Sequence, residues 1–145
     1  MRELPRKLTV DELAELFEGR TTLAERLAEV ESPLERADEV LAGLDEAEKI
    51  EALNAHPAIG ARRLSPRSSK EQGVDADPAI LAELAYQNRV YEEKFGFRFV
   101  VFVAGRPKRE ILTVLSARIG NAREEELDTG LRELVAIARN RWTRT

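Results

Sequence analysis

Residues 77–103 read DPAILAELAYQNRVYEEKFGFRFVVFV, and this stretch decides the fold. Asp77-Pro78 is a helix-start signal, Gly96 is a stop signal, and apolar residues repeat at helical spacing between them. Residues 97–103 are then aromatic and β-branched, as in a strand. The sequence holds no second run of this kind, and a lone strand leaves its backbone groups unpaired. We therefore expect a helix followed by an extended segment near 97–103, whose free N–H groups can bind a ligand.

Similar start and stop signals recur along the rest of the chain. A capping residue precedes an acidic one by three positions at Thr9, Asp45 and Asn121, and Pro follows Ser32 and Ser65. Gly43 and Gly120 are further stops. The sequence thus predicts an all-α protein, a single compact multi-helix domain over residues 1–145 with seven or eight helices. The expected helices lie at about 9–18, 22–30, 33–43, 46–55, 66–73, 78–95, 108–119 and 122–142.

The composition argues against several classes of protein. The 145 residues carry a net charge of −4 and no Cys, and they include a single His. Interleaved charges and a pI near 5.3 argue against nucleic-acid binding. A zinc site draws on several N or S ligands, so we expect no metal. The sequence contains no apolar stretch of about 18 residues that would indicate a membrane span. We expect a cytoplasmic protein.

The single histidine lies in the stretch AHPAIG at residues 55–60, directly after an expected helix. Pro57 biases His56 away from helical backbone angles, so the imidazole should project from a turn. Imidazole titrates near neutrality, which suits proton transfer. The simpler interpretation is a histidine that only interacts with the end of a helix.

Three polar residues follow at helical spacing in the stretch SSKEQ, residues 68–72. If this stretch is helical, Ser68, Glu71 and Gln72 lie on one face. A hydroxyl, a carboxylate and an amide suit a small polar heterocycle. The alternative is a solvated helix end, which this composition also fits.

Two other elements place polar groups beside apolar stripes. Asn88 and Tyr91 share the apolar face of the helix at 78–95, either as an internal hydrogen bond or as a pocket wall. Arg118 lies in the last turn of its helix, where a cation is favourable in any protein. It would also suit an anionic substrate, because a guanidinium donates paired hydrogen bonds.

Taken in order, these motifs resemble a known family. The series A-H-P-x-I-G, S-x-x-E-Q, N-x-x-Y-x-x-K-F-G-F-x-F and R-x-x-N with following acidic residues is similar to the 2-oxo-4-hydroxy-4-carboxy-5-ureidoimidazoline (OHCU) decarboxylases. The resemblance runs from about Asn54 to Trp142. Its order and spacing are specific, whereas each motif alone is weak.

The resemblance implies a carboxy-lyase of urate and purine catabolism that decarboxylates OHCU to (S)-allantoin. It implies an all-helical homodimer without a cofactor, associated in function with uricase and hydroxyisourate hydrolase. His56 matches the catalytic acid/base, and Glu71 matches an acid that pairs with the histidine or orients the substrate. The matching substrate-binding residues are Pro57, Ser68, Gln72, Phe99, Val100, Val101 and Arg118.

The chain also departs from the family pattern. A Pro-Trp pair and an Arg-Pro-Phe element of the N-terminal half are missing, Arg98 replaces a usual Pro, and the loop between Gln72 and Asn88 looks short. These changes would alter a pocket lid, the dimer surface or the specificity. Two alternatives therefore stay open: a lyase or hydrolase acting on a related ureido or 2-oxo acid, and a non-catalytic helical partner of ureide-pathway enzymes.

Overall fold

The computed structural model describes residues 3–58 and 77–144, and these contain seven α-helices and no strand. The all-α fold class is confirmed. The eighth expected helix, at 66–73, lies outside the described residues. The helices are α1 (Val10–Phe17), α2 (Thr22–Leu27), α3 (Ala37–Ala42), α4 (Glu46–Ala55), α6 (Pro78–Phe95), α7 (Lys108–Ile119) and α8 (Arg123–Arg144).

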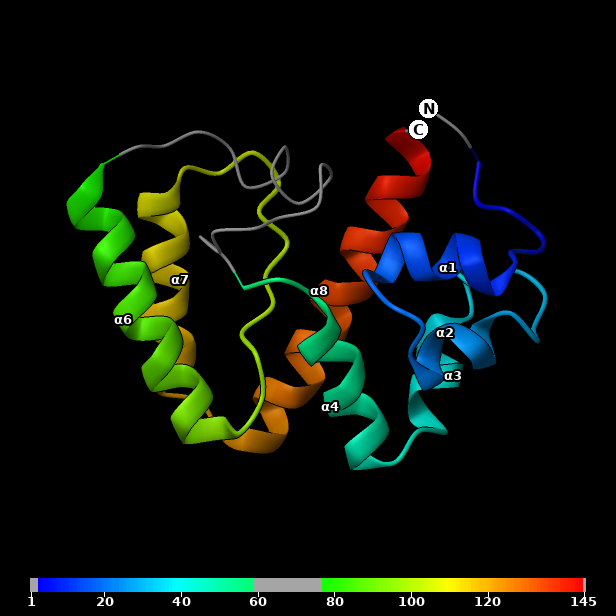
Figure 1. Cartoon of the computed structure of the whole chain (residues 1–145), viewed down its shortest axis with the longest axis horizontal. Helices are drawn as coiled ribbons and strands as arrows, with labels where there is room; N and C mark the ends of the chain where they lie inside the picture. Colours follow the sequence, from blue (N-terminus) through cyan, green and yellow to red (C-terminus); the bar gives the residue numbers. More distant parts are fainter. Residues whose placement is uncertain (1–2, 59–76, 145) are drawn as a thin grey trace.

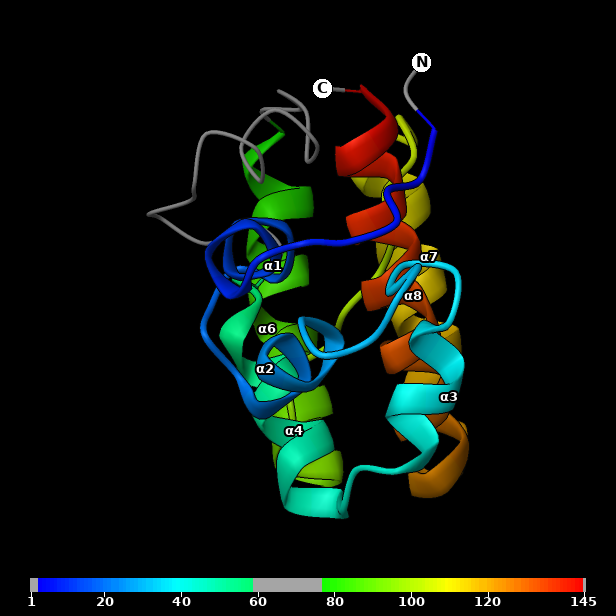
Figure 2. The ribbon, with the colours of Figure 1, turned by 90° about the vertical axis from the view of Figure 1, so that its right-hand side faces the viewer.

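The long helix α8 separates two groups of helices (Figure 1). On one side α6 and α7 pack against each other as a hairpin, and on the other side α1, α3 and α4 contact α8. Figure 2 shows α3 alongside α8. The two ends of the described chain lie close together, where Trp142 Nε1 donates a hydrogen bond to the carbonyl oxygen of Glu3 at 2.6 Å. None of the described helices is long and apolar enough to cross a membrane.

Local capping signals set most of the helix boundaries. Thr9 and Asp45 each form the expected capping box, with the acidic side chain three residues on returning to the cap N–H group. Asp77 caps α6 through the N–H of Ala79, with Pro at the first helical position. Gly96 ends α6 in the left-handed conformation at φ +81°, which glycine adopts without strain. These boundaries agree with the predictions because each depends on neighbouring residues only.

The helix expected over 33–43 was wrong in its first half. Only Ala37–Ala42 is helical, and the preceding residues form a turn. Ser32 adopts φ +51°, whereas a helix N-cap has an extended backbone. Its N–H group donates to the carbonyl oxygen of Arg6 at 2.7 Å, a tertiary contact that the local Ser-Pro signal does not reveal.

The extended segment, residues 97–103, is confirmed as a non-helical, non-strand connection between α6 and α7. Five of its side chains belong to the core: Phe97, Phe99, Val100, Val101 and Val103 are at most 6% exposed. The ring of Tyr91 packs on this core, with its centroid 5.2 Å from that of Phe99. Burial therefore holds the segment in place without strand pairing.

Close packing of α4 on α8 brings the C-terminal end of α4 towards the core. A Cβ atom added to Gly130 would lie 3.2 Å from Leu53 Cδ2, which is tighter than ordinary contact. Glycine at this position lets the two helices approach each other. The residues that follow α4, His56 and Pro57, are thereby held beside the extended segment, as the contacts of Arg98 described below show.

Candidate active site

His56 ends α4 as its C-cap, at the turn that the following proline predicted. Its backbone is extended, with φ −77° and ψ 136°, and its N–H group donates to the carbonyl oxygen of Leu53 at 3.2 Å. The residue is 7% exposed. The ring atom Nδ1 is buried and has no hydrogen-bond partner among the described residues. A buried imidazole without a partner on this nitrogen is an unusual feature for a purely structural histidine.

The surroundings of His56 favour its neutral form. The pKa of His56 is lowered from 6.5 to about 4, mainly by burial; the nearby Arg141 and Arg98 guanidinium groups contribute to the lowering, and the Glu18 carboxylate opposes it. Arg141 and Glu18 form an ion pair at 3.1 Å, with the Arg141 side chain only 1% exposed. His56 is therefore uncharged at neutral pH and is able to accept a proton.

Arg98 links His56 to the extended segment. Its Nη1 atom donates to the carbonyl oxygens of His56 and Asn54, at 2.7 and 3.1 Å. Its own backbone N–H group donates to Asn54 Oδ1 at 3.0 Å. Arg98 therefore binds the end of α4 through both its side chain and its backbone.

The backbone of the extended segment offers hydrogen-bond donors. The N–H group of Phe102 donates to Glu133 Oε1 at 3.2 Å. In contrast, the part of the chain that the structure describes supplies no acceptor to the N–H groups of Phe99, Val100 and Val101, although all three residues are buried. Buried backbone donors normally have partners, so these three groups are suited to bind a ligand.

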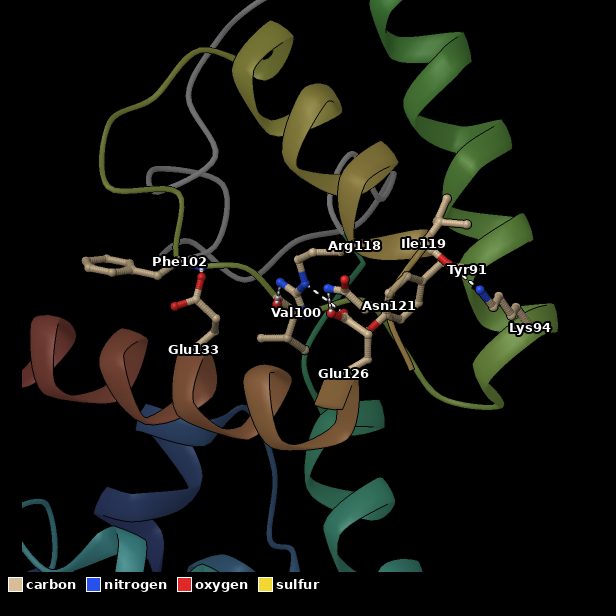
Figure 3. Close-up of polar contacts among 9 residues, drawn as sticks. All are labelled: Tyr91, Lys94, Val100, Phe102, Arg118, Ile119, Asn121, Glu126 and Glu133. Carbon is tan, nitrogen blue, oxygen red and sulfur yellow. Dashed lines mark hydrogen bonds and ion pairs between the residues drawn. The ribbon is translucent and has the colours of Figure 1, made fainter. Parts of the chain in front are cut away.

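Arg118 approaches the same segment from α7 (Figure 3). Its Nη1 atom donates to the carbonyl oxygen of Val100 at 2.8 Å, and its guanidinium carbon lies 4.6 Å from the centre of the Phe99 ring. Its Nε atom donates to Glu126 Oε1 at 2.7 Å. The remaining Nη2 group is buried and has no partner among the described residues. Within the part of the chain that the structure describes, one donor group of Arg118 is thus buried without an acceptor.

Glu126 is the centre of a buried hydrogen-bond network that fixes Arg118. Glu126 is fully buried and accepts three hydrogen bonds, shown together in Figure 3. Besides Arg118, Tyr91 donates its hydroxyl to Oε1 at 2.7 Å and Asn121 donates Nδ2 to Oε2 at 2.8 Å. Burial and the bond to Glu126 raise the pKa of Tyr91, so its hydroxyl stays protonated. Asn121 lies two positions before the first residue of α8, Arg123, and its side-chain amide donates to Glu126.

Sequence reasoning did not single out Glu126 or Arg141 as part of this site. The signal that finds them is the apolar stripe of α8, whose buried face continues from Leu131, Leu134 and Ala138 to Glu126 in one direction and Arg141 in the other. A charged residue at a core position of a helix needs a charged partner inside the protein. The partners, Arg118 and Glu18, come from other helices, so spacing alone does not identify them.

The predicted site residues fall into two groups. The contacts above bring together the regions of His56 and Pro57, of Phe99, Val100 and Val101, and of Arg118. Ser68, Glu71 and Gln72 lie outside the described residues. Within 3–58 and 77–144, no three His, Cys, Asp or Glu side chains gather to hold a metal ion. The described groups are a neutral imidazole, a buried guanidinium donor and unpaired backbone N–H groups, which suit proton transfer on a small anion.

The chain is similar to proteins of urate degradation. The family model described as OHCU decarboxylase matches residues 2–143, which extends the resemblance over the N-terminal half. The 2-oxo-4-hydroxy-4-carboxy-5-ureidoimidazoline decarboxylase of Haloferax volcanii is 28% identical over 141 residues, covering 89% of this chain and 83% of that protein. The uric acid degradation bifunctional protein PucL of Bacillus subtilis is 27% identical over 152 residues, covering 97% of this chain. The chain spans only 31% of that relative's length.

A solved structure shares the fold. The crystal structure of an OHCU decarboxylase in the presence of (S)-allantoin has a TM-score of 0.77 and 24% sequence identity. The similarity covers 92% of this chain and 96% of that one. The overall fold is therefore one already seen in a solved protein.

Proposed function

Because this chain belongs to the OHCU decarboxylase family, we propose that it converts OHCU to (S)-allantoin with release of CO2. The observation that supports this most directly is the set of contacts joining three predicted elements. Arg98 binds the carbonyl oxygen of His56 from the extended segment, and Arg118 binds the carbonyl oxygen of Val100 in the same segment. The proposed proton-transfer group and the proposed anion-binding group are thus both hydrogen-bonded to residues of the extended segment.

The substrate's chemistry matches these groups. Loss of CO2 from the carboxylate of OHCU breaks one C–C bond and leaves its electron pair on the ring. The ring provides its own electron sink, so the reaction needs a proton shuttle, an anion-binding group and hydrogen bonds that orient the ring. The electron pair moves into the adjoining C=N bond of the ring, whose nitrogen takes up one proton from solvent, so that the OHCU anion and one proton give CO2 and allantoin. His56, Arg118 and the backbone of the extended segment meet these needs.

His56 acts as the proton shuttle in this proposal. Its neutral imidazole accepts the proton of the ring hydroxyl group as that carbon becomes a carbonyl. The imidazolium then gives this proton to the neighbouring ring carbon on one face, which sets the (S) configuration. The lowered pKa of His56 supports this order of events, since the uncharged form is present at neutral pH before the substrate reacts.

Arg118 and the extended segment bind the substrate. The Nη2 group of Arg118 donates to the anionic end, and the N–H groups of Phe99, Val100 and Val101 donate to ring or ureido oxygens. Pro57 contacts the substrate next to His56. Ser68, Gln72 and Glu71 complete the set as in the resemblance, with Glu71 pairing with His56 or orienting the ring.

We also propose a cytoplasmic homodimer that forms a single domain over residues 1–145 and works in sequence with uricase and hydroxyisourate hydrolase. The family match over residues 2–143 supports a single domain. The uric acid degradation bifunctional relatives support the functional association. Light scattering after size-exclusion chromatography tests the dimer, because a mass near 16.3 kDa would instead identify a monomer.

The activity is tested with OHCU made in place by uricase and hydroxyisourate hydrolase. Circular dichroism follows (S)-allantoin for the wild type and for His56→Ala and His56→Gln, whose folding is checked by far-UV spectra. Rapid formation of one enantiomer that is lost in both folded variants supports the proposal. Racemic product at the uncatalysed rate from folded wild type contradicts it and favours a related ureido acid or a non-catalytic role. Turnover that survives in both variants removes His56 from the mechanism.

A further inference from the structure

Arg98 places a cation at the C-terminal end of α4, where the helix itself has no basic residue. The last turn of α4 contains no basic residue, and the carbonyl groups at a helix C-terminus need donors from elsewhere. Pro57 has no N–H group to offer. The Arg98 guanidinium instead donates to the carbonyl oxygens of Asn54 and His56, while Glu92 lies 3.5 Å from its Nε atom.

The backbone of His56 is therefore held from both sides. Its N–H group donates to Leu53 and its carbonyl oxygen accepts from Arg98. A catalytic imidazole is usually oriented by a hydrogen bond to its second ring nitrogen. In His56 the Nδ1 atom has no such partner among the described residues. Among the described contacts, the position of the ring therefore depends on its backbone anchor and on packing.

We propose that Arg98 is a positioning residue for His56, which holds the carbonyl group of the histidine and so places the imidazole for proton transfer. The inference rests on the proposed function of His56. It assigns no contact between Arg98 and the substrate. A one-ångström displacement of a catalytic group can lower a rate by about 100-fold, so an anchor at this point has a large effect on turnover.

Arg98 also belongs to the charges that face His56. The others among the described residues are Arg141 on α8 and Glu18 at the end of α1. Removing the Arg98 charge takes away one of the two cations that disfavour the imidazolium. The pKa of His56 therefore reports the presence of the Arg98 charge beside the imidazole.

The test compares Arg98→Met and Arg98→Lys with the matched control Arg106→Met. Arg106 also donates to backbone carbonyls of the extended segment, those of Phe102 and Val103, but is not among the charges that shift the pKa of His56. We expect Arg98→Met to lower kcat by about 10- to 100-fold with little change in KM, and to lower the enantiomeric excess of the allantoin. Arg98→Lys should recover part of kcat. Arg106→Met should lower stability while kcat stays within about threefold of the wild type.

A second measurement needs no substrate. His56 is the only histidine, so the imidazole signals of the untagged protein are assigned in an NMR titration without ambiguity. Arg98→Met should raise the pKa of His56, and Arg98→Lys should leave it closer to that of the wild type. An unchanged kcat in folded Arg98→Met overturns the inference, as does an equal loss in Arg106→Met. An inactive wild type overturns the proposed function instead, and the titration then still decides whether Arg98 acts on His56.

Discussion

The Nε atom of Arg118 lies 2.7 Å from Oε1 of Glu126, and the two side chains are 8% and 0% exposed. An ion pair this deeply buried gains little over a well-packed apolar pair, because both charges lose their hydration. Breaking it from one side is costly, since the other charge is left buried without its partner. The pair therefore makes the position of Arg118 depend on Glu126.

Glu126→Gln should destabilise the fold strongly. The amide keeps the volume of the side chain but removes the negative charge opposite Arg118, and such changes in buried pairs cost about 3–5 kcal/mol. Urea denaturation gives the free energy of unfolding. Glu125→Gln is the control, because Glu125 is an exposed neighbour on the same helix and should change stability by less than about 0.5 kcal/mol. Equal stabilities of the two variants would contradict the central role of Glu126.

Arg118→Lys should weaken substrate binding while the protein stays folded. An ammonium group cannot donate in three directions with the fork geometry of a guanidinium, so it cannot bind Glu126, Val100 and the substrate together. We expect KM for OHCU to rise by about tenfold or more. Arg123→Lys is a matched control, because Arg123 also donates to a backbone carbonyl and lies over an aromatic ring. A KM equally raised in Arg123→Lys would show a general effect of losing a guanidinium.

The parts of the fold that the sequence predicts are those with local causes. Thr9 and Asp45 cap their helices through residues three positions away, and Gly96 ends α6 through its own backbone freedom. The extended segment follows from a single β-rich run without a partner. His56 was expected in a turn because proline restricts the residue before it. None of these inferences requires knowledge of residues far away in the chain.

The features that were missed depend on tertiary contacts. Ser32 looks like a helix N-cap locally, but its bond to Arg6 places it in a turn. Arg118 looks like an ordinary cation at a helix end until Glu126 is seen 2.7 Å away. In the sequence, Arg98 is only a departure from the family pattern. Its hydrogen bonds to the end of α4 are the basis of its proposed role. Residues 68–72 remain a prediction because they lie outside the described residues.

Glu18→Gln should destabilise the protein less than Glu126→Gln. Glu18 pairs with the buried Arg141, but its side chain is 15% exposed and Arg141 also donates to the carbonyl oxygen of Leu16. We expect a loss of about 2 kcal/mol in the free energy of unfolding. The pKa of His56 should fall further, because the Glu18 carboxylate raises it. Urea denaturation and the NMR titration measure the two effects, with the exposed Glu15→Gln as control. A rise in the pKa of His56 in Glu18→Gln would show that a group other than Glu18 dominates the electrostatic potential at the imidazole.

His56 should also make stability depend on pH within a defined window. Its pKa is about 4 in the folded protein, against a usual value of 6.5, so between these values the unfolded chain binds the proton and the folded protein does not. The free energy of unfolding therefore falls as the pH is lowered from 6.5 towards 4, by about 3 kcal/mol in total, and His56 contributes no slope above 6.5. Urea denaturation at about pH 7.5, 6 and 5 compares the wild type with His56→Gln, which has no titratable group at this position. We expect the wild type to lose more stability than the variant over that range. Parallel pH profiles would mean that the folded protein accommodates the charged imidazole, and His56 would then not be held in its neutral form.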